Sequence, residues 1–169
     1  MAELRIEEGP LGIVIPACIE IPSGSRNKYE AGPDGSLWLD RVLWASLVYP
    51  MDYGYVPNTA ADDGDPLDIM VAVTEPTFPG CHIPARLVGA LNMTDNKGPD
   101  SKIISVCAVD PRFHHIGCID DFGPHFRAEV THFFLTYKEL EGKSVTIDGW
   151  LDAAAAVEMV RAAAAAAKG

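Results

Sequence analysis

The hydrophobic pattern of this chain changes period about two thirds of the way along. Before residue 110, short apolar runs alternate with groups of turn-forming residues, whereas after residue 120 apolar residues recur at helical spacing. No linker long enough to separate two domains interrupts the pattern. Because 169 residues is about the length of one domain, we expect 1–169 to form a single domain of the α+β class, mainly β.

The expected strands are short and bounded by turns. In residues 67–73 the side chains Leu67, Ile69, Val71 and Val73 alternate with Asp68, Met70 and Ala72. This period of two predicts a strand with one core face and a second face that carries Asp68. Segments 86–93 and 102–109 flank residues 94–101, whose composition is typical of a hairpin loop. Two further stretches of strand length are 13–21 and 37–42. Several short strands in succession indicate a small barrel or a sandwich.

Two helices are expected after the strands. Apolar spacing predicts the first over 124–142, with proline in its first turn and glycine past its end. The second follows Asp152 and carries the alanine-rich segment 153–168. Alanine offers little side chain for packing, so we interpret this segment as a surface helix or C-terminal extension with a frayed end, and expect no site in it.

Charge restricts the partners of the chain. The 24 Asp and Glu residues outnumber the 13 Lys and Arg residues, which gives a net charge of -11. Phosphate backbones are bound by basic surfaces, so a nucleic-acid partner is not expected. A small anionic substrate is also disfavoured unless metal cations intervene.

The compartment is also indicated by the sequence. The N-terminus lacks a basic start followed by an apolar run, and nowhere do eighteen apolar residues follow one another. We therefore expect no signal peptide, no membrane contact and a cytoplasmic location. The widely spaced Cys18, Cys81, Cys107 and Cys118 are interpreted as reduced core residues.

The densest charged feature is the run DDGDPLD at residues 62–68. A turn here brings Asp63, Asp65 and Asp68 close together, and like charges at short range cost free energy. A solvated acidic turn is one interpretation; a bound hard cation is the other. Carboxylate oxygens without Cys or His favour magnesium, manganese or calcium. A calcium-binding EF-hand loop fails in both possible registers, since it would need ligands at Leu67 and Thr74 or at Gly64.

A second acidic pair, Asp95 and Asp100, brackets the expected hairpin loop, with Lys102 just beyond it. Taken alone, the pair could be an ordinary loop feature. Together the two clusters supply the carboxylates for a multi-metal site that assists phosphoryl transfer. The segment Gly142-Lys143-Ser144 is rejected as a phosphate loop because it follows a helix and lacks the first glycine. The histidines show no ligand set and are interpreted as surface or packed residues.

A longer set of motifs resembles the soluble family I inorganic pyrophosphatases of bacterial type. The resemblance covers roughly residues 15–150, and its most specific element is Asp63-Gly64-Asp65-Pro66-Leu67-Asp68. The other motifs are Glu20-Ile21-Pro22, Asn27-Lys28-Tyr29-Glu30, Asp40-Arg41, Tyr49-Pro50-Met51-Asp52-Tyr53-Gly54-Tyr55, Met93-Thr94-Asp95, Asp100-Ser101-Lys102, His132-Phe133-Phe134 and Tyr137-Lys138. Asn96 stands where many relatives carry an acid.

The resemblance implies hydrolysis of pyrophosphate to two phosphates by a metal-activated water, on a small five-stranded, OB-like barrel flanked by two helices. It implies magnesium as the cofactor, with manganese or another divalent ion as a substitute, and a homo-oligomer, most often a hexamer. The implied metal ligands are Glu20, Glu30, Asp63, Asp68, Asp95 and Asp100. The implied phosphate contacts are Lys28, Arg41, Tyr53, Lys102, Tyr137 and Lys138. Asp65 is the implied general base, and the residue matching Asp100 has that role in some members.

Simple chemistry supports these roles. Arg41 suits a bidentate grip on a phosphate, while the lysines act as point charges. Asp65 lies between two expected ligands, near enough to hydrogen-bond an attacking water. Tyr137 also lies on the apolar stripe of its helix, where core packing is the alternative role. Two rival functions are a phosphatase or nucleotide hydrolase that uses the same metals, and a metal- or phosphate-binding module without turnover.

Overall fold

Five strands close into a ring in the computed structural model, which describes residues 3–168. The strands are β1 (Glu7–Gly9), β2 (Gly12–Ile21), β3 (Asn27–Ala31), β4 (Leu37–Val42), β5 (Asp52–Tyr55), β6 (Asp68–Ala72), β7 (His82–Asp95), β8 (Gly98–Pro99), β9 (Lys102–Cys107) and β10 (Thr146–Leu151). The ring follows the order β2, β5, β6, β9, β7, and antiparallel pairing of β7 with β2 closes it. Only β6 and β9 are paired in parallel within this ring. The closed ring confirms the five-stranded barrel and excludes the sandwich.

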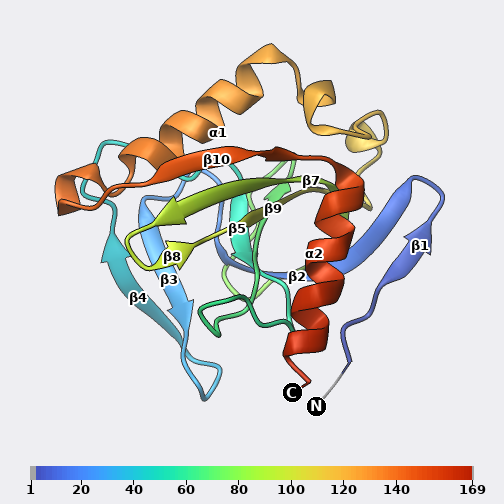
Figure 1. The fold of residues 1–169 in the computed structure, drawn as a ribbon, viewed down its shortest axis with the longest axis horizontal. Helices are drawn as coiled ribbons and strands as arrows, with labels where there is room; N and C mark the ends of the chain where they lie inside the picture. Colours follow the sequence, from blue (N-terminus) through green and yellow to red (C-terminus); the bar gives the residue numbers. More distant parts are fainter. Residues whose placement is uncertain (1–2, 169) are drawn as a thin grey trace.

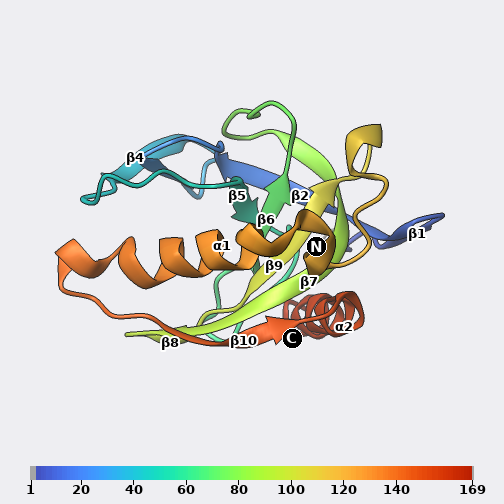
Figure 2. The same cartoon turned by 90° about the horizontal axis from the view of Figure 1, so that it is seen from above.

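The barrel is packed on both faces of its strands. Ile69 and Val71 of β6 belong to one buried cluster, which includes residues of the helix α2 (Ala153–Ala166). Met70 between them is equally buried, in a second cluster that includes residues of the helix α1 (Pro124–Thr136). The two helices therefore cover different faces of the strands (Figure 2). The alternation in residues 67–73 predicts the strand correctly, but the face that carries Asp68 is largely core.

The first helix is shorter than the expected 124–142. The α-helix α1 ends at Thr136, and the chain continues into a short 3-10 helix, Glu139–Glu141. Gly142 closes that turn in the left-handed region at φ 71°, where glycine is favoured because it has no Cβ. The final turn of the expected helix is thus a separate element, which changes where its side chains point.

The alanine-rich helix begins where the sequence predicts. The side chain of Asp152 caps α2 by accepting a hydrogen bond from the backbone N–H of Ala155 at 2.9 Å. Ala156, Val160 and Ala163 are buried against the barrel, where α2 crosses β7 (Figure 1). The small side chains let the helix lie close to the strands.

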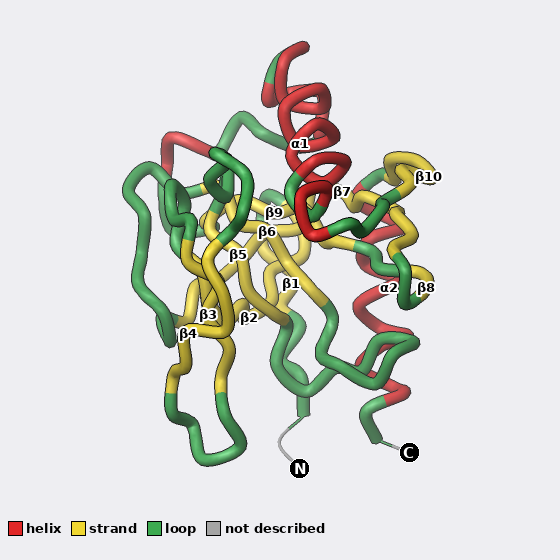
Figure 3. The backbone as a smooth tube through the Cα atoms, turned by 90° about the vertical axis from the view of Figure 1, so that its left-hand side faces the viewer, coloured by secondary structure: helices red, strands yellow, loops and turns green. Residues whose placement is uncertain are grey.

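A two-stranded sheet stands beside the barrel. Strands β3 and β4 pair only with each other and form a hairpin that extends away from the ring (Figure 3). β3 was not expected as a strand, because its sequence Asn-Lys-Tyr-Glu-Ala is mostly polar. The short strands β5 and β10 were missed as well. Within residues 3–168 no helix is long and apolar enough to span a membrane.

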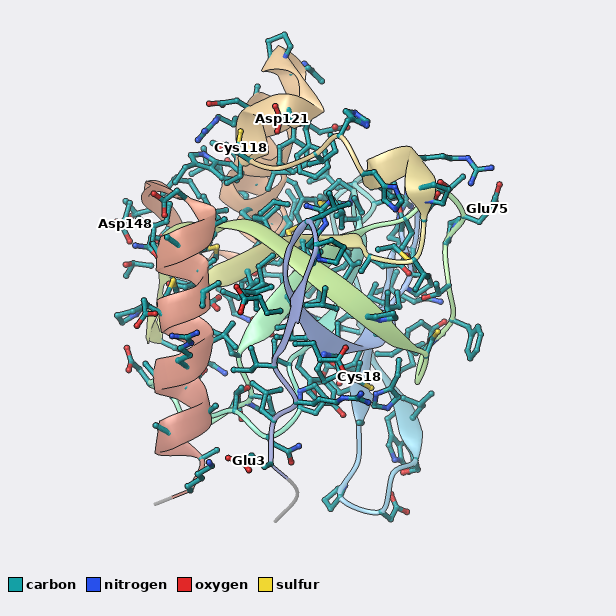
Figure 4. All side chains as sticks on the ribbon, turned by 90° about the vertical axis from the view of Figure 1, so that its right-hand side faces the viewer. Glu3, Cys18, Glu75, Cys118, Asp121 and Asp148 are labelled. Carbon is teal, nitrogen blue, oxygen red and sulfur yellow. The ribbon has the colours of Figure 1, made fainter. Side chains whose placement is uncertain are left out.

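The cysteines are only partly where we expected them. All four are free thiols, but Cys18 alone is buried and Cys118 is exposed. Figure 4 shows Cys18 and Cys118 far apart, on different parts of the molecule. The core placement predicted for Cys118 is therefore wrong: it caps the short 3-10 helix Ile119–Phe122 at the surface.

Candidate active site

One cavity of about 1050 Å³ gathers every candidate residue. It lies where the barrel meets the β3–β4 hairpin and the acidic loop, which comprises residues 61–67 before β6. The segment that follows α1 and the C-terminal half of α2 complete its walls. Its walls include Glu20, Lys28, Glu30, Arg41, Tyr53, Asp63, Asp65, Asp68, Asp95, Asp100, Lys102, Tyr137 and Lys138. These residues come from distant parts of the chain, so their convergence is a property of the fold.

The acidic loop is held in shape by its own backbone. Ala61 donates its N–H to the carbonyl of Asp65 at 2.7 Å, and Gly64 donates to the carbonyl of Ala61 at 2.9 Å. Gly64 has φ 86°, so the turn requires a residue tolerant of the left-handed region. The loop presents Asp63 and Asp65 as exposed side chains, while Asp68 begins β6 and is half-buried. The three carboxylates border one cavity but are not equally exposed to solvent.

A buried lysine joins two of the carboxylates. The parallel register of β6 and β9 places Lys102 opposite Asp68, and its ammonium contacts Asp68 and Asp100. Only 2% of the Lys102 side chain is exposed. Burial alone would lower the pKa of Lys102, but the charges of Asp68 and Asp100 outweigh burial and raise it. Lys102 is thus held charged at the cavity wall.

Two tyrosines complete this part of the wall. The Tyr53 hydroxyl donates to Asp68 Oδ2 at 2.7 Å, and burial raises the pKa of Tyr53 well above its usual value. Tyr137 is also buried, and its ring packs against Phe133 and Phe134. Burial raises the pKa of Tyr137, so both tyrosines keep their hydroxyl protons and can donate. Tyr137 therefore packs in the core and borders the cavity at once.

Asp95 and Asp100 both border the cavity but have different partners. Asp95 accepts from the backbone N–H of Lys97 at 2.7 Å and from Lys138 Nζ at 3.0 Å. Burial favours its neutral form, yet these donors outweigh burial and lower the pKa of Asp95. Burial raises the pKa of Asp100 despite the opposing charge of Lys102. The strands on either side of residues 94–101 pair in antiparallel, as expected for a hairpin. The two carboxylates form separate ion pairs, Asp95 with Lys138 and Asp100 with Lys102.

The β3–β4 hairpin supplies the opposite wall. Lys28 contacts Glu30 and lies 3.3 Å from Asp40 Oδ2. Glu20 of β2 accepts from the backbone N–H of Ala31 at 3.2 Å, and burial raises the pKa of Glu20. The hairpin thus adds two cations, Lys28 and Arg41, and two carboxylates, Glu30 and Asp40, to the cavity margin, and Glu20 of β2 adds a third carboxylate beside them.

Sequence reasoning missed several residues of the cavity. Lys143 lines it, in the segment rejected as a phosphate loop, and Glu141 pairs with Arg41 behind the wall. Met159 and Ala163 of α2 also line it, so the expectation that the alanine-rich helix stays away from any site is wrong. One signal could have placed Lys143 near the cavity. Gly142 ends the helical spacing, and a glycine in the left-handed region there turns the chain back toward Lys138. Nothing in the sequence pairs Glu141 with Arg41.

The donor set suits a hard divalent cation. The acidic side chains offer only oxygen, and they outnumber the lysines and arginines around the cavity. Across residues 3–168, however, no three acidic, His or Cys side chains stand close enough together to form a ready-made metal site. Lys102 and Lys138 instead contact the carboxylates that would serve as ligands. The residues fit a metal by chemistry, provided that these ion pairs rearrange.

Comparisons with known proteins agree with this description. A family model described as inorganic pyrophosphatase matches residues 17–168. The inorganic pyrophosphatase of Leifsonia xyli is 53% identical over 146 residues, which cover 85% of this chain and 90% of the relative. That of Synechocystis is 49% identical over 157 residues, covering 92% and 93%. The crystal structure of inorganic pyrophosphatase from Thermus thermophilus superposes with a TM-score of 0.91 at 48% identity, covering 96% of this chain and 95% of that one.

Proposed function

The chain belongs to the inorganic pyrophosphatase family, and from that membership we propose that its acidic cluster holds magnesium ions for the hydrolysis of pyrophosphate. The reaction class, an inorganic diphosphatase, follows from the family. The observation that carries the finer proposal is the single cavity shared by all the candidate carboxylates and cations. The proposed ligands are Glu20, Glu30, Asp63, Asp68, Asp95 and Asp100.

Charge explains why cations are needed there. Pyrophosphate is itself strongly anionic and would be repelled by a wall rich in carboxylates. Bound magnesium would neutralise the substrate and lower the pKa of the attacking water. Manganese or another divalent ion with oxygen preference could replace it.

The remaining steps are assigned to residues of this chain. We assign Asp65 the removal of a proton from the attacking water, because it is exposed at the cavity wall between Asp63 and Asp68. Asp100 is the alternative base. Arg41 and Lys28 grip phosphate oxygens from the hairpin side, while Lys102 and Lys138 offset the charge that develops on the leaving phosphate. Tyr53 and Tyr137 donate hydroxyl hydrogen bonds.

Phosphate release from pyrophosphate tests this proposal. The purified chain is assayed with magnesium, with magnesium plus a chelator, and with ATP or a phosphomonoester as the substrate. Magnesium-dependent release from pyrophosphate alone is expected. Faster release from ATP would favour the nucleotide hydrolase, and metal or phosphate binding without any release would favour the binding module.

We also propose that the chain works as a single cytoplasmic domain over residues 1–169 that assembles into a homohexamer. Exposed large apolar residues on the hairpin and the adjacent loop support an assembly, because such side chains are usually covered by a partner. They include Leu37, Trp38, Leu39 and Trp44. Light scattering coupled to gel filtration tests it: a mass near 18 kDa, that of one chain, would exclude a stable hexamer.

A further inference from the structure

A carboxylate behind the cavity wall joins two of its cations. Glu141 Oε2 accepts from Arg41 Nη1 at 2.7 Å and from Lys143 Nζ at 3.0 Å. Arg41 and Lys143 line the cavity, whereas Glu141 does not, and only 7% of its side chain is exposed. Glu141 therefore touches both cations from the protein side, where it cannot contact a ligand in the cavity.

The contact joins two elements that lie far apart in the sequence. Arg41 lies on β4, whose hairpin forms its own sheet, and Glu141 lies one hundred residues later at the end of the helical segment after α1. Lys143 N–H donates to the Lys138 carbonyl at 3.2 Å, so the left-handed Gly142 turns the chain back on itself. The fold thus places Lys143 and Arg41 side by side through one acidic residue.

Arg41 has a second carboxylate within reach. Asp40 Oδ2 lies 3.8 Å from Arg41 Nε, and the Asp40 side chain is 37% exposed. An ion pair is stronger where solvent is excluded, so Glu141 is the better partner for Arg41. Without the charge of Glu141, the guanidinium is expected to turn toward Asp40.

The pair leaves one donor and one acceptor unused. Arg41 Nε and Glu141 Oε1 are buried without a hydrogen-bond partner, although a guanidinium and a carboxylate can form a two-bond fork. Unpaired buried polar atoms cost free energy, so this single-bond arrangement is not the one that packing for stability alone would favour. Because Nε is buried and Nη1 donates to Glu141, Nη2 is the guanidinium nitrogen left for an anion in the cavity.

We propose that Glu141 is a positioning residue for pyrophosphate, which aims Arg41 and Lys143 together at one phosphate group. Two cations held side by side repel each other, and a shared carboxylate offsets that repulsion while it leaves a net positive charge toward the cavity. Lys143 becomes a further phosphate contact. The inference rests on the proposed contact between Arg41 and phosphate.

The first test is Glu141→Gln, which keeps the shape of the side chain and removes its charge. We expect the KM for pyrophosphate to rise roughly tenfold while kcat changes far less, because the lost contact orients binding groups. Glu139→Gln is the matched control: it removes the same charge from an exposed position of the same 3-10 helix. Its KM should stay within about twofold of the parent value.

A double variant separates the positioning role of Glu141 from the phosphate contact proposed for Arg41. In Arg41→Ala, adding Glu141→Gln should raise KM by much less than it does in the parent, because the positioning residue then acts through Lys143 alone. Equal effects of Glu141→Gln with and without Arg41 would overturn the inference, as would a parent-like KM in Glu141→Gln. An Arg41→Ala variant with parent-like KM would instead overturn the proposed role of Arg41.

A third variant keeps the inference testable if Glu141→Gln lowers the melting temperature too far for kinetics. Lys143 is 40% exposed, so Lys143→Ala should fold normally. We expect it to raise KM severalfold and to weaken inhibition by inorganic phosphate to a similar degree. Unchanged KM and unchanged phosphate inhibition would contradict the shared grip on one phosphate.

Discussion

The exposed Asp65 is the residue whose chemistry is most open to test. Asp65→Asn keeps the size of the side chain but removes the proton acceptor, so we expect turnover to fall by about 10²-fold or more near neutral pH. The melting temperature should change little because the Asp65 side chain is exposed. Steady-state phosphate release, with unfolding followed in parallel, measures both.

The comparison that decides the base is Asp100→Asn. If Asp65→Asn retains near-parent turnover while Asp100→Asn is inactive, the proton acceptor is Asp100. Asp148→Asn serves as a charge-matched control, since that carboxylate accepts from Thr94 away from the cavity walls. It should retain parent turnover.

Gly54 shows a different constraint, imposed by strand spacing. A Cβ added there would lie 1.9 Å from the carbonyl oxygen of Cys18 on the neighbouring strand β2. Backbone atoms cannot move aside as a flexible side chain can, so we expect Gly54→Ala to lower the free energy of unfolding by about 3 kcal/mol or more. Denaturant unfolding measures the loss.

Gly117→Ala is the matched control for this substitution. A Cβ added there would lie 3.6 Å from Asp121 Oδ2, which is an ordinary van der Waals contact. The free energy of unfolding should change by less than about 1 kcal/mol. Similar losses in both variants would show that close approach of β2 and β5 is not the cause.

Among the elements, α2 has the role least expected from its composition. The Ala163 carbonyl accepts from the backbone N–H of Ala60 at 2.9 Å, directly before the acidic loop. Ala163 is buried against the barrel, where a larger side chain would push the helix away. The alanine-rich helix therefore supports the loop that carries Asp63 and Asp65.

Ala163→Leu tests this support. We expect the free energy of unfolding to fall by about 1–3 kcal/mol from overpacking, and turnover to fall because the acidic loop shifts. Ala165→Leu adds the same volume on the exposed side of the helix and should alter neither quantity appreciably. Reduced stability with parent turnover in Ala163→Leu would show that the loop does not depend on α2.

The elements also show what local pattern can and cannot predict. The strand that carries Asp68 and the cap at Asp152 were predictable because alternation and capping are local signals. The parallel pairing of Asp68 with Lys102 joins segments more than thirty residues apart, and no local pattern specifies it. The early end of α1 was missed because Gly142 closes a separate 3-10 turn after Thr136.

The candidate site follows the same division. Its carboxylates and cations were identifiable because they stand in short motifs, and the fold brings every one of them to a single cavity. The partners were not predictable: Lys138 pairs with Asp95 across 43 positions and Arg41 with Glu141 across 100. Residue type reveals which groups can do chemistry, whereas long-range packing decides which groups meet.

At the scale of the whole molecule, the net charge of -11 couples folding to cations and to pH. Burial raises the pKa values of Glu20 and Asp100. A carboxyl with a raised pKa in the fold stabilises the fold at low pH, and this contribution is lost as the pH rises through the folded pKa. In the metal-free chain, these two groups should therefore lower the free energy of unfolding at neutral and alkaline pH.

Magnesium should remove that penalty, since it binds the ionised carboxylates and competes with their protons. With magnesium at about one hundred times its dissociation constant, we expect the melting temperature to rise by roughly 5–10 °C near pH 8 relative to chelator. Near pH 5 the increase should be smaller, because protons then occupy part of the ligand set. Sodium chloride at equal ionic strength is the control for screening. An equal increase with sodium chloride, or a larger one near pH 5, would contradict a carboxylate-bound magnesium site in this cavity.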